Sequence, residues 1–259
     1  MRALLLADDR QRASALVRTV SFALALALLS GVCIAAFSLL NYHWAWQPVL
    51  NYRQLFWDGW LATLAISGLA LPLSCLLGLA FALARRSRFL PLRDFARIYV
   101  ELTRGTPLLV QLFFYWYIFG QALSRDFRFL AGALILALFS AAYISEIIRA
   151  GIEGIGRSQL ESARAIGLTR AQTYRYVIFP QAFRQILPPL AGQFASIIKD
   201  SSLLSVLGIA EFSLAASQVN AFTYSAFESY LPVILGYLAL TLPISLWTQS
   251  LEKRARFET

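Results

Sequence analysis

The chain alternates between long apolar segments and short segments rich in charged residues. Six apolar segments have about the length that a helix needs to cross a bilayer, which is roughly 20 residues. They are predicted at 17–40, 57–84, 98–120, 129–150, 183–207 and 229–250. The pattern therefore predicts an all-α integral membrane protein with about six transmembrane helices.

Composition and charge agree with this prediction. Of the 259 residues, 58% are hydrophobic and 14% are charged, whereas soluble domains carry roughly 25% charged residues. The net charge of +9 does not indicate a nucleic-acid partner, because 19 of the 23 lysines and arginines lie in the N-terminal tail, in 85–104, in 149–184 or in 253–256. Since connections rich in lysine and arginine stay in the cytoplasm, this distribution predicts six crossings with both termini cytoplasmic.

The sequence carries no signature of an enzyme. It contains no G-x-x-x-x-G-K-[ST] segment, the loop that holds nucleotide phosphates, so we do not expect the chain to hydrolyse ATP itself. Cys33, Cys75 and the single histidine, His43, form neither a catalytic set nor a metal-ligand spacing. We therefore expect no catalytic residue, no cofactor and no metal.

The connection 151–182 has the pattern of an ordered helical hairpin. Ser158 and Glu161 have the spacing of a capping box at a helix start, and Gly167 stands where that helix would end in a left-handed residue. Thr169 and Gln172 form a second capping box, which starts another helix. The small apolar face predicted for the hairpin consists of Leu160, Ala163, Ile166 and Leu168. A hairpin of this kind, rimmed by arginines, indicates a surface that docks another protein.

The same connection resembles the EAA loop of ATP-binding-cassette (ABC) importer permeases. That family's pattern is Glu-Ala-Ala, three residues, Gly, nine residues and Ile-x-Leu-Pro. The spacing is intact here, with Ser, Val and Phe replacing one Ala, the Ile and the Leu. The resemblance implies that this loop couples the chain to a separate ATPase through Glu161, Ser162, Ala163, Gly167 and Pro180.

Other segments are similar to the polar amino-acid uptake branch of these permeases. They are 99–111, 145–152, 180–184 and 198–203. The resemblance implies a five-helix importer permease core, with the first apolar segment as an extra N-terminal helix. We therefore expect two parts. One is 1–50, with the tail, the first helix and the outer loop, and the other is 51–259, the permease domain with the coupling loop 151–182.

The resemblance also implies a location and partners. The location is a bacterial inner membrane. The partners are two cytoplasmic ATP-binding subunits, a second permease (identical or related), a periplasmic or extracellular solute-binding protein and an amino-acid substrate.

Polar residues inside the fifth apolar segment are the candidate translocation path. They are Lys199, Asp200, Ser201 and Ser202. A charged group at mid-bilayer costs a few kcal/mol unless it is paired or hydrated. Two interpretations stay open: Lys199 and Asp200 form a structural ion pair between helices, or the polar group lines the path and meets the ammonium or carboxylate of an amino acid.

The predicted function is that of a permease subunit in an ATP-driven importer for polar amino acids. One alternative is the same architecture importing an opine or an osmolyte, which a binding assay on the solute-binding protein would distinguish. A second is an ATPase-independent channel or transporter, which predicts uptake by this chain alone. A third is a membrane scaffold that moves nothing, which predicts no substrate-stimulated ATP hydrolysis.

Overall fold

The structure is a computed structural model that describes residues 15–40, 42–119 and 125–255. All the regular secondary structure in these ranges is helical, which confirms the predicted all-α class. The chain divides into two compact units, Met1–Ala45 and Trp46–Thr259.

The first unit contains helix α2 (Ala15–Ser38). At 1.5 Å per residue its 24 residues extend about 36 Å, enough to cross a hydrocarbon core of about 30 Å. Its segment Thr19–Ser38 has a mean hydropathy of 2.4. Large apolar side chains such as Leu28 and Ile34 are exposed. An exposed apolar surface on a helix of this length suits lipid rather than water.

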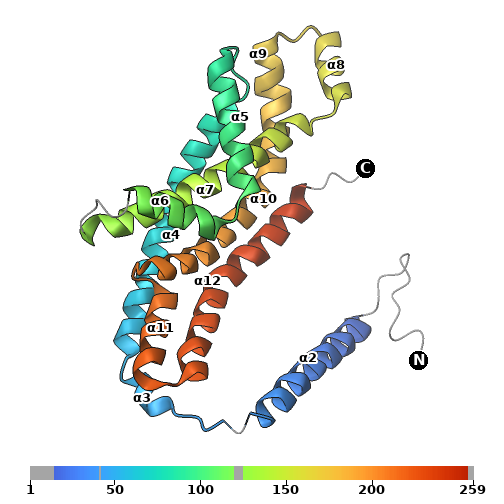
Figure 1. Ribbon diagram of the computed structural model, residues 1–259. Helices are drawn as coiled ribbons and strands as arrows, with labels where there is room; N and C mark the ends of the chain where they lie inside the picture. The colour runs from blue at the N-terminus through green and yellow to red at the C-terminus, as the bar shows by residue number, and fades with distance from the viewer. Residues whose placement is uncertain (1–14, 41, 120–124, 256–259) are drawn as a thin grey trace. The chain divides into compact units, whose positions relative to one another are not determined.

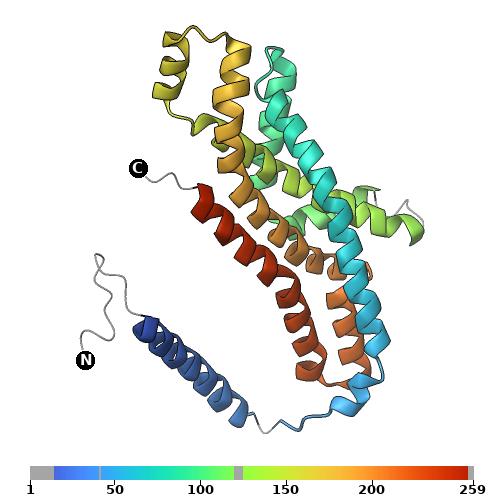
Figure 2. The same ribbon diagram turned by 180° about the vertical axis from the view of Figure 1, so that it is seen from behind.

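The second unit is a bundle whose long helices run beside one another (Figures 1 and 2). Its first half contains α3 (Trp46–Leu50), α4 (Arg53–Ala84), α5 (Leu90–Gly105), α6 (Leu108–Phe119) and α7 (Arg125–Glu153). Its second half contains α8 (Arg157–Ala165), α9 (Arg170–Thr173), the π-helix η2 (Tyr174–Ile178), α10 (Phe179–Asp200), the 3₁₀-helix η3 (Ser201–Leu207), α11 (Phe212–Thr223) and α12 (Ala226–Ala255).

The core of this bundle lies where α4, α6, α7, α10 and η3 meet. Ile66 of α4, Leu112 of α6, Leu136 of α7 and Ile197 of α10 are all fully buried in one cluster. The helix pair α4 and α7 has the most extensive contact of the bundle. In lipid no hydrophobic effect drives helices together, so a contact as close as that of α4 with α7 depends on small residues at the interface.

Glycine makes the contact of α4 with α7 possible at one point. A Cβ atom on Gly78 would lie 2.6 Å from Cγ2 and 2.8 Å from Cβ of Ile144 on α7. Real Cβ atoms essentially never approach so closely. The two helices could not keep this distance with a larger residue at position 78.

Four helices of the described residues are long and apolar enough to cross a membrane, and a fifth is added if one bent pair counts as a single span. The four are Thr19–Ser38, Arg53–Ala84, Phe127–Glu153 and Ala226–Lys253, and the bent pair is Arg170–Leu207 with Phe212–Thr223. They correspond to five of the six predicted segments, and the predicted segment 98–120 is the exception.

The prediction of one continuous helix over 98–120 is wrong. The chain forms α5 and then α6, with Thr106 in an extended conformation between them. The break follows from Pro107, because a proline disfavours the helical conformation of the residue before it. Gln111 satisfies the backbone groups that the break releases: its Nε2 donates to the carbonyl oxygens of Thr103 (2.8 Å) and Thr106 (3.1 Å). Such satisfaction is what permits a helix break at membrane depth.

The fifth predicted segment also differs at its outer end. After Asp200 the helix tightens into η3 and ends at Gly208, which is left-handed. The chain then turns into α11, which is bent by 45° from the preceding helix. The connection between the fifth and sixth predicted segments therefore contains a helix of 12 residues.

Candidate coupling and translocation sites

The predicted hairpin is present, and its turn has a complete hydrogen-bonded geometry. α8 ends at Ala165, Ile166 is its C-cap residue, and Gly167, which follows, has a φ of +78°. The N–H of Leu168 donates to the carbonyl of Ala163, and the N–H of Gly167 donates to that of Arg164, both at 3.0 Å. These two bonds define a Schellman motif, so the prediction that Gly167 caps the helix is confirmed.

Of the two predicted capping boxes, the second is present and the first is wrong. Thr169 accepts a hydrogen bond from the N–H of Gln172, and the Gln172 side chain accepts one from the N–H of Thr169. Ser158 is not a cap, because α8 already begins at Arg157 and its N-cap residue is Gly156. A glycine is an accepted N-cap residue, so the sequence offered two adjacent starts and the earlier one is used.

The predicted apolar face of the hairpin is only partly buried. Ala163 is 2% exposed, and Leu160 packs on the cluster of Ile155, Ile178 and Ala182. Ile166, predicted on the same apolar face, is 75% exposed. It is the last residue before Gly167, where the chain leaves the helix, so its side chain no longer follows the helical face.

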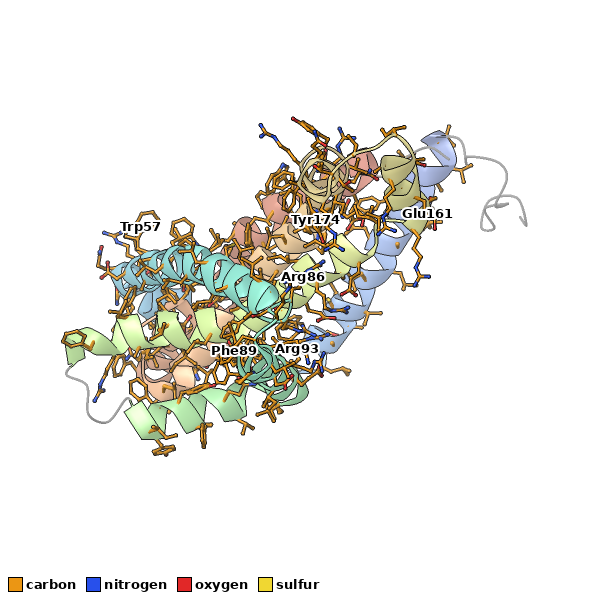
Figure 3. The ribbon with its side chains drawn as sticks, turned by 90° about the horizontal axis from the view of Figure 1, so that it is seen from above. Trp57, Arg86, Phe89, Arg93, Glu161 and Tyr174 are labelled. Carbon is orange, nitrogen blue, oxygen red and sulfur yellow. The ribbon has the colours of Figure 1, made fainter. Side chains whose placement is uncertain are left out.

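The predicted coupling residues fall into an outward set and an inward one. Glu161 and Ser162 are exposed, and Glu161 points away from the bundle in Figure 3. Ala163 faces the bundle, and Gly167 forms the turn. Pro180 is exposed at the second residue of α10, directly after the π-helix η2. The hairpin therefore presents a carboxylate, a hydroxyl and the apolar Ile166 side chain to whatever lies beyond it.

The second helix of the hairpin continues into the core of the bundle. α9, η2, α10 and η3 form one helical run from Arg170 to Leu207. At about 1.5 Å per residue the run is about 55 Å long. Its first turns belong to the hairpin, and its far end carries the predicted path residues. Pro188 and Pro189 lie within α10, where they free carbonyl groups of the preceding turn.

A charged network joins three helices at the arginine-rich end. Glu146 of α7 accepts a hydrogen bond from Nη1 of Arg85, at the end of α4, at 2.8 Å. It also bonds Arg149, one turn further along α7, and lies 3.7 Å from Nη1 of Arg104 on α5. Arg149 in turn bonds Glu153. The network fixes the ends of α4, α5 and α7 relative to one another.

The predicted path residues lie where α10 tightens into η3. Ser201 is fully buried and its Oγ donates to the carbonyl of Ile198 at 2.7 Å, while Oγ of Ser202 donates to that of Lys199 at 2.6 Å. Lys199 is exposed and Asp200 is half-buried. In the part of the chain that the structure describes, no ion pair joins Lys199 to Asp200. Their backbone positions differ by one residue, so the two side chains leave the helix in different directions.

Glu211 is a buried polar residue that sequence reasoning missed. It is 1% exposed and caps α11, because its carboxylate accepts from the N–H groups of Ser213 (2.8 Å) and Leu214 (2.6 Å). The hydroxyl of Tyr237 on α12 donates to the same carboxylate at 2.8 Å. Beside it lies a small cavity of about 90 Å³, whose polar lining includes Asp58 and Gln218. Glutamate is not among the residues preferred at an N-cap, so local sequence signals did not identify this helix start.

The chain matches known proteins over most of its length. Residues 74–257 match the family described as "Binding-protein-dependent transport system inner membrane component". A probable glutamine ABC transporter permease (GlnM) of Bacillus subtilis strain 168 is 38% identical over 200 residues, covering 77% of this chain and 93% of that protein. A glutamate/aspartate import permease (GltJ) of Escherichia coli K12 is 32% identical over 241 residues, covering 84% and 97%.

Solved structures give the same result. A chain of a crystal structure of an amino acid ABC transporter with histidines has a TM-score of 0.75 and 38% identity, and the match covers 82% of this chain and all of that one. A chain of the methionine ABC transporter MetNI in an inward-facing conformation has a TM-score of 0.62 at 18% identity, covering 82% and 99%, which supports the fold alone. The chain belongs to the binding-protein-dependent transport system inner membrane components and is a multi-pass permease subunit of an ABC importer, whose ATPase is a separate subunit.

Proposed function

We propose that this permease carries polar amino acids of the glutamine, glutamate and aspartate class into the cell. The names of the related permeases support this class, since they transport glutamine or glutamate and aspartate. The competing function is the import of an opine or an osmolyte by the same architecture. Uptake of labelled glutamine, glutamate and aspartate, measured against an opine and a betaine in proteoliposomes with the complete importer, decides between them.

The α8–α9 hairpin is the proposed docking element for the ATPase. The observation that carries this assignment is the unbroken helical run from Arg170 to Leu207. Because one helical run contains both the second helix of the hairpin and residues 199–202, a force on the hairpin acts directly on the helix of the proposed path. Glu161 and Ser162 would contact the ATPase, the buried Ala163 would hold the hairpin on the bundle, Gly167 would shape its turn, and Pro180 would lie exposed where the hairpin leads into α10.

The proposed assembly follows the arrangement implied by the EAA loop. As a binding-protein-dependent ABC permease, the chain works with an ATPase and a solute-binding protein. We place both termini in the cytoplasm and pair the chain with a second permease, identical or related, and with two ATPase subunits. Residues 1–50 would form the accessory helix and its flanking segments. Residues 51–259 would form the permease domain, which includes the coupling loop 151–182.

Reversing one exposed charge tests the coupling assignment. Glu161→Lys is expected to abolish uptake while membrane insertion stays normal, because it places a like charge among the arginines of the hairpin and removes the outward carboxylate. Glu252→Lys, an exposed acid near the end of α12, is the matched control and is expected to keep uptake. Wild-type uptake by Glu161→Lys would refute the docking role.

A second pair of variants tests the path. Asp200→Asn and Ser201→Ala are expected to assemble with the ATPase and to change the uptake kinetics, because Asp200 is half-buried and Ser201 is fully buried at the bend of the helix. The measurement is the initial rate of amino-acid uptake against substrate concentration. Wild-type kinetics in both assembled variants would assign these residues to structure alone.

A further inference from the structure

A groove beneath the hairpin has no role in the function proposed above. It encloses about 450 Å³ between the end of α4, the end of α7 and the helices α8 and α9. Four arginines line it: Arg86, Arg157, Arg164 and Arg170. We refer to it as the arginine groove.

The arginine groove has a basic rim and an apolar floor. Ile155, Leu160, Leu168 and Ile178 line its interior. Ile155 and Ile178 are buried, so the floor is a fixed part of the bundle. A cavity with these two parts fits a ligand that has an anionic end and an apolar end.

The positive charge of the rim is largely uncompensated. Glu153 is the one acidic residue among the lining residues, and Arg149 already bonds it. Among the residues that the structure describes, Arg157, Arg164 and Arg170 take part in no ion pair. Arg86 donates to the hydroxyl of Tyr174 at 3.0 Å, and Figure 3 shows the two side chains side by side. This bond leaves the Arg86 charge unneutralised.

The groove adjoins the ends of two helices that are long and apolar enough to cross a membrane. Arg86 follows the apolar segment of α4 by two residues, and Glu153 is the last residue of the span Phe127–Glu153. Tyr176, Phe179 and Phe183, just beyond the groove, are exposed. Tyrosine side chains such as that of Tyr176 are enriched at the boundary between water and hydrocarbon, and exposed phenylalanines suit the hydrocarbon itself.

We propose that the arginine groove binds the phosphate group of an anionic phospholipid, with the adjoining apolar part of the lipid on the isoleucine and leucine floor. Guanidinium groups bind phosphate with two parallel hydrogen bonds, and basic pockets between helices at the cytoplasmic face hold anionic headgroups. The occupant is a lipid rather than a free phosphate because the floor is apolar and the groove meets the bilayer. A lipid there links the hairpin to the ends of α4 and α7, so membrane composition bears on how firmly the hairpin is held.

Native mass spectrometry of the intact importer tests the proposal. The complex is purified in detergent and titrated with phosphatidylglycerol or with zwitterionic phosphatidylcholine. The wild-type complex is expected to retain phosphatidylglycerol preferentially. Arg164→Gln/Arg170→Gln is expected to weaken that binding on the order of 25-fold, about fivefold for each arginine. Arg88→Gln/Arg97→Gln, two exposed arginines outside the groove, is the matched control and is expected to bind as the wild type does.

A charge-preserving variant guards against misfolding. Arg164→Lys/Arg170→Lys keeps the net charge and loses only the two-bond geometry, so an intermediate affinity is expected. Equal retention of phosphatidylglycerol by the wild type and the glutamine variant would overturn the proposal. So would release of the lipid by millimolar inorganic phosphate in micelles of unchanged composition, which would identify a free-phosphate site. Lipid retention only after removal of the ATPase would also overturn it, because the groove would then receive the ATPase. The experiment measures lipid binding and not uptake. A negative result would therefore refute the lipid site without bearing on the proposed transport function.

Discussion

The turn at Gly167 allows the coupling assignment to be tested through backbone strain alone. Its φ of +78° lies in the left-handed region, and nothing lies within 4 Å of the position that a Cβ would take. A substitution there therefore clashes with no neighbouring side chain. It acts only through the energy of the left-handed conformation, on which both hydrogen bonds of the turn depend.

The size of the effect follows from that energy. A left-handed conformation costs an ordinary L-residue about 1–2 kcal/mol, and every 1.4 kcal/mol is a factor of ten in an equilibrium. Gly167→Ala is therefore expected to shift the equilibrium of the turn away from its hydrogen-bonded form. The ratio of hydrogen-bonded to opened turn should fall by about 5- to 30-fold. Gly167→Val is expected to cost more, because a β-branched residue is a conformational outlier there, whereas asparagine adopts the region more readily.

Two measurements check the series. Hydrogen exchange of the peptide 157–168 is expected to lose protection in the order Gly, Asn, Ala, Val, and uptake is expected to fall in the same order. Gly105→Ala is the control, because Gly105 also has open space at its Cβ position but lies outside the left-handed region. Unchanged protection and uptake in Gly167→Val would show that the turn geometry is dispensable and would refute the reasoning.

Two further predictions concern the bundle. Gln111→Leu keeps the size of the side chain and removes the donor to the carbonyls of the buried Thr103 and of Thr106 at the α5–α6 break, so it is expected to lower the free energy of unfolding by about 1–3 kcal/mol. Unfolding in mixed micelles measures this, and the exposed Gln218→Leu should have little effect. Gly78→Ala is expected to cost about 1–3 kcal/mol by forcing Ile144 aside. In a double-mutant cycle with Ile144→Ala its cost should shrink, and strictly additive costs would contradict the predicted clash.

The sequence alone was sufficient to predict those parts of the fold that depend on local signals. Apolar length located five of the spanning segments, because a bilayer imposes that length on any helix that crosses it. The Thr169 capping box and the Gly167 turn are set by hydrogen bonds within a few residues, and both are present. The resemblance to ABC importer permeases, recognised from the spacing around Glu161, is confirmed by the family match over 74–257.

The features that sequence reasoning missed depend on side-chain hydrogen bonds and on turn geometry, which hydropathy and residue spacing do not reveal. The break before Pro107 is tolerated because Gln111 lies across it, and hydropathy alone does not indicate that. The start of α11 at Glu211 depends on Tyr237 from another helix. Ile166 fitted an apolar face by spacing, yet the turn directs it outward. The roles of the coupling and path residues stay predictions.

The break between α5 and α6 also bears on how the chain enters the membrane during synthesis. The described part of α6, Leu108–Phe119, has 12 residues and extends about 18 Å, well short of a hydrocarbon core of about 30 Å. Neither α6 nor the amphipathic α5 is by itself a segment that the insertion machinery would retain in the bilayer. Their stable placement thus requires partners already in position, above all α7, which packs on both. We therefore expect α5 and α6 to reach their final position only after α7 has been synthesised, through tertiary assembly rather than through the hydrophobicity of their own residues.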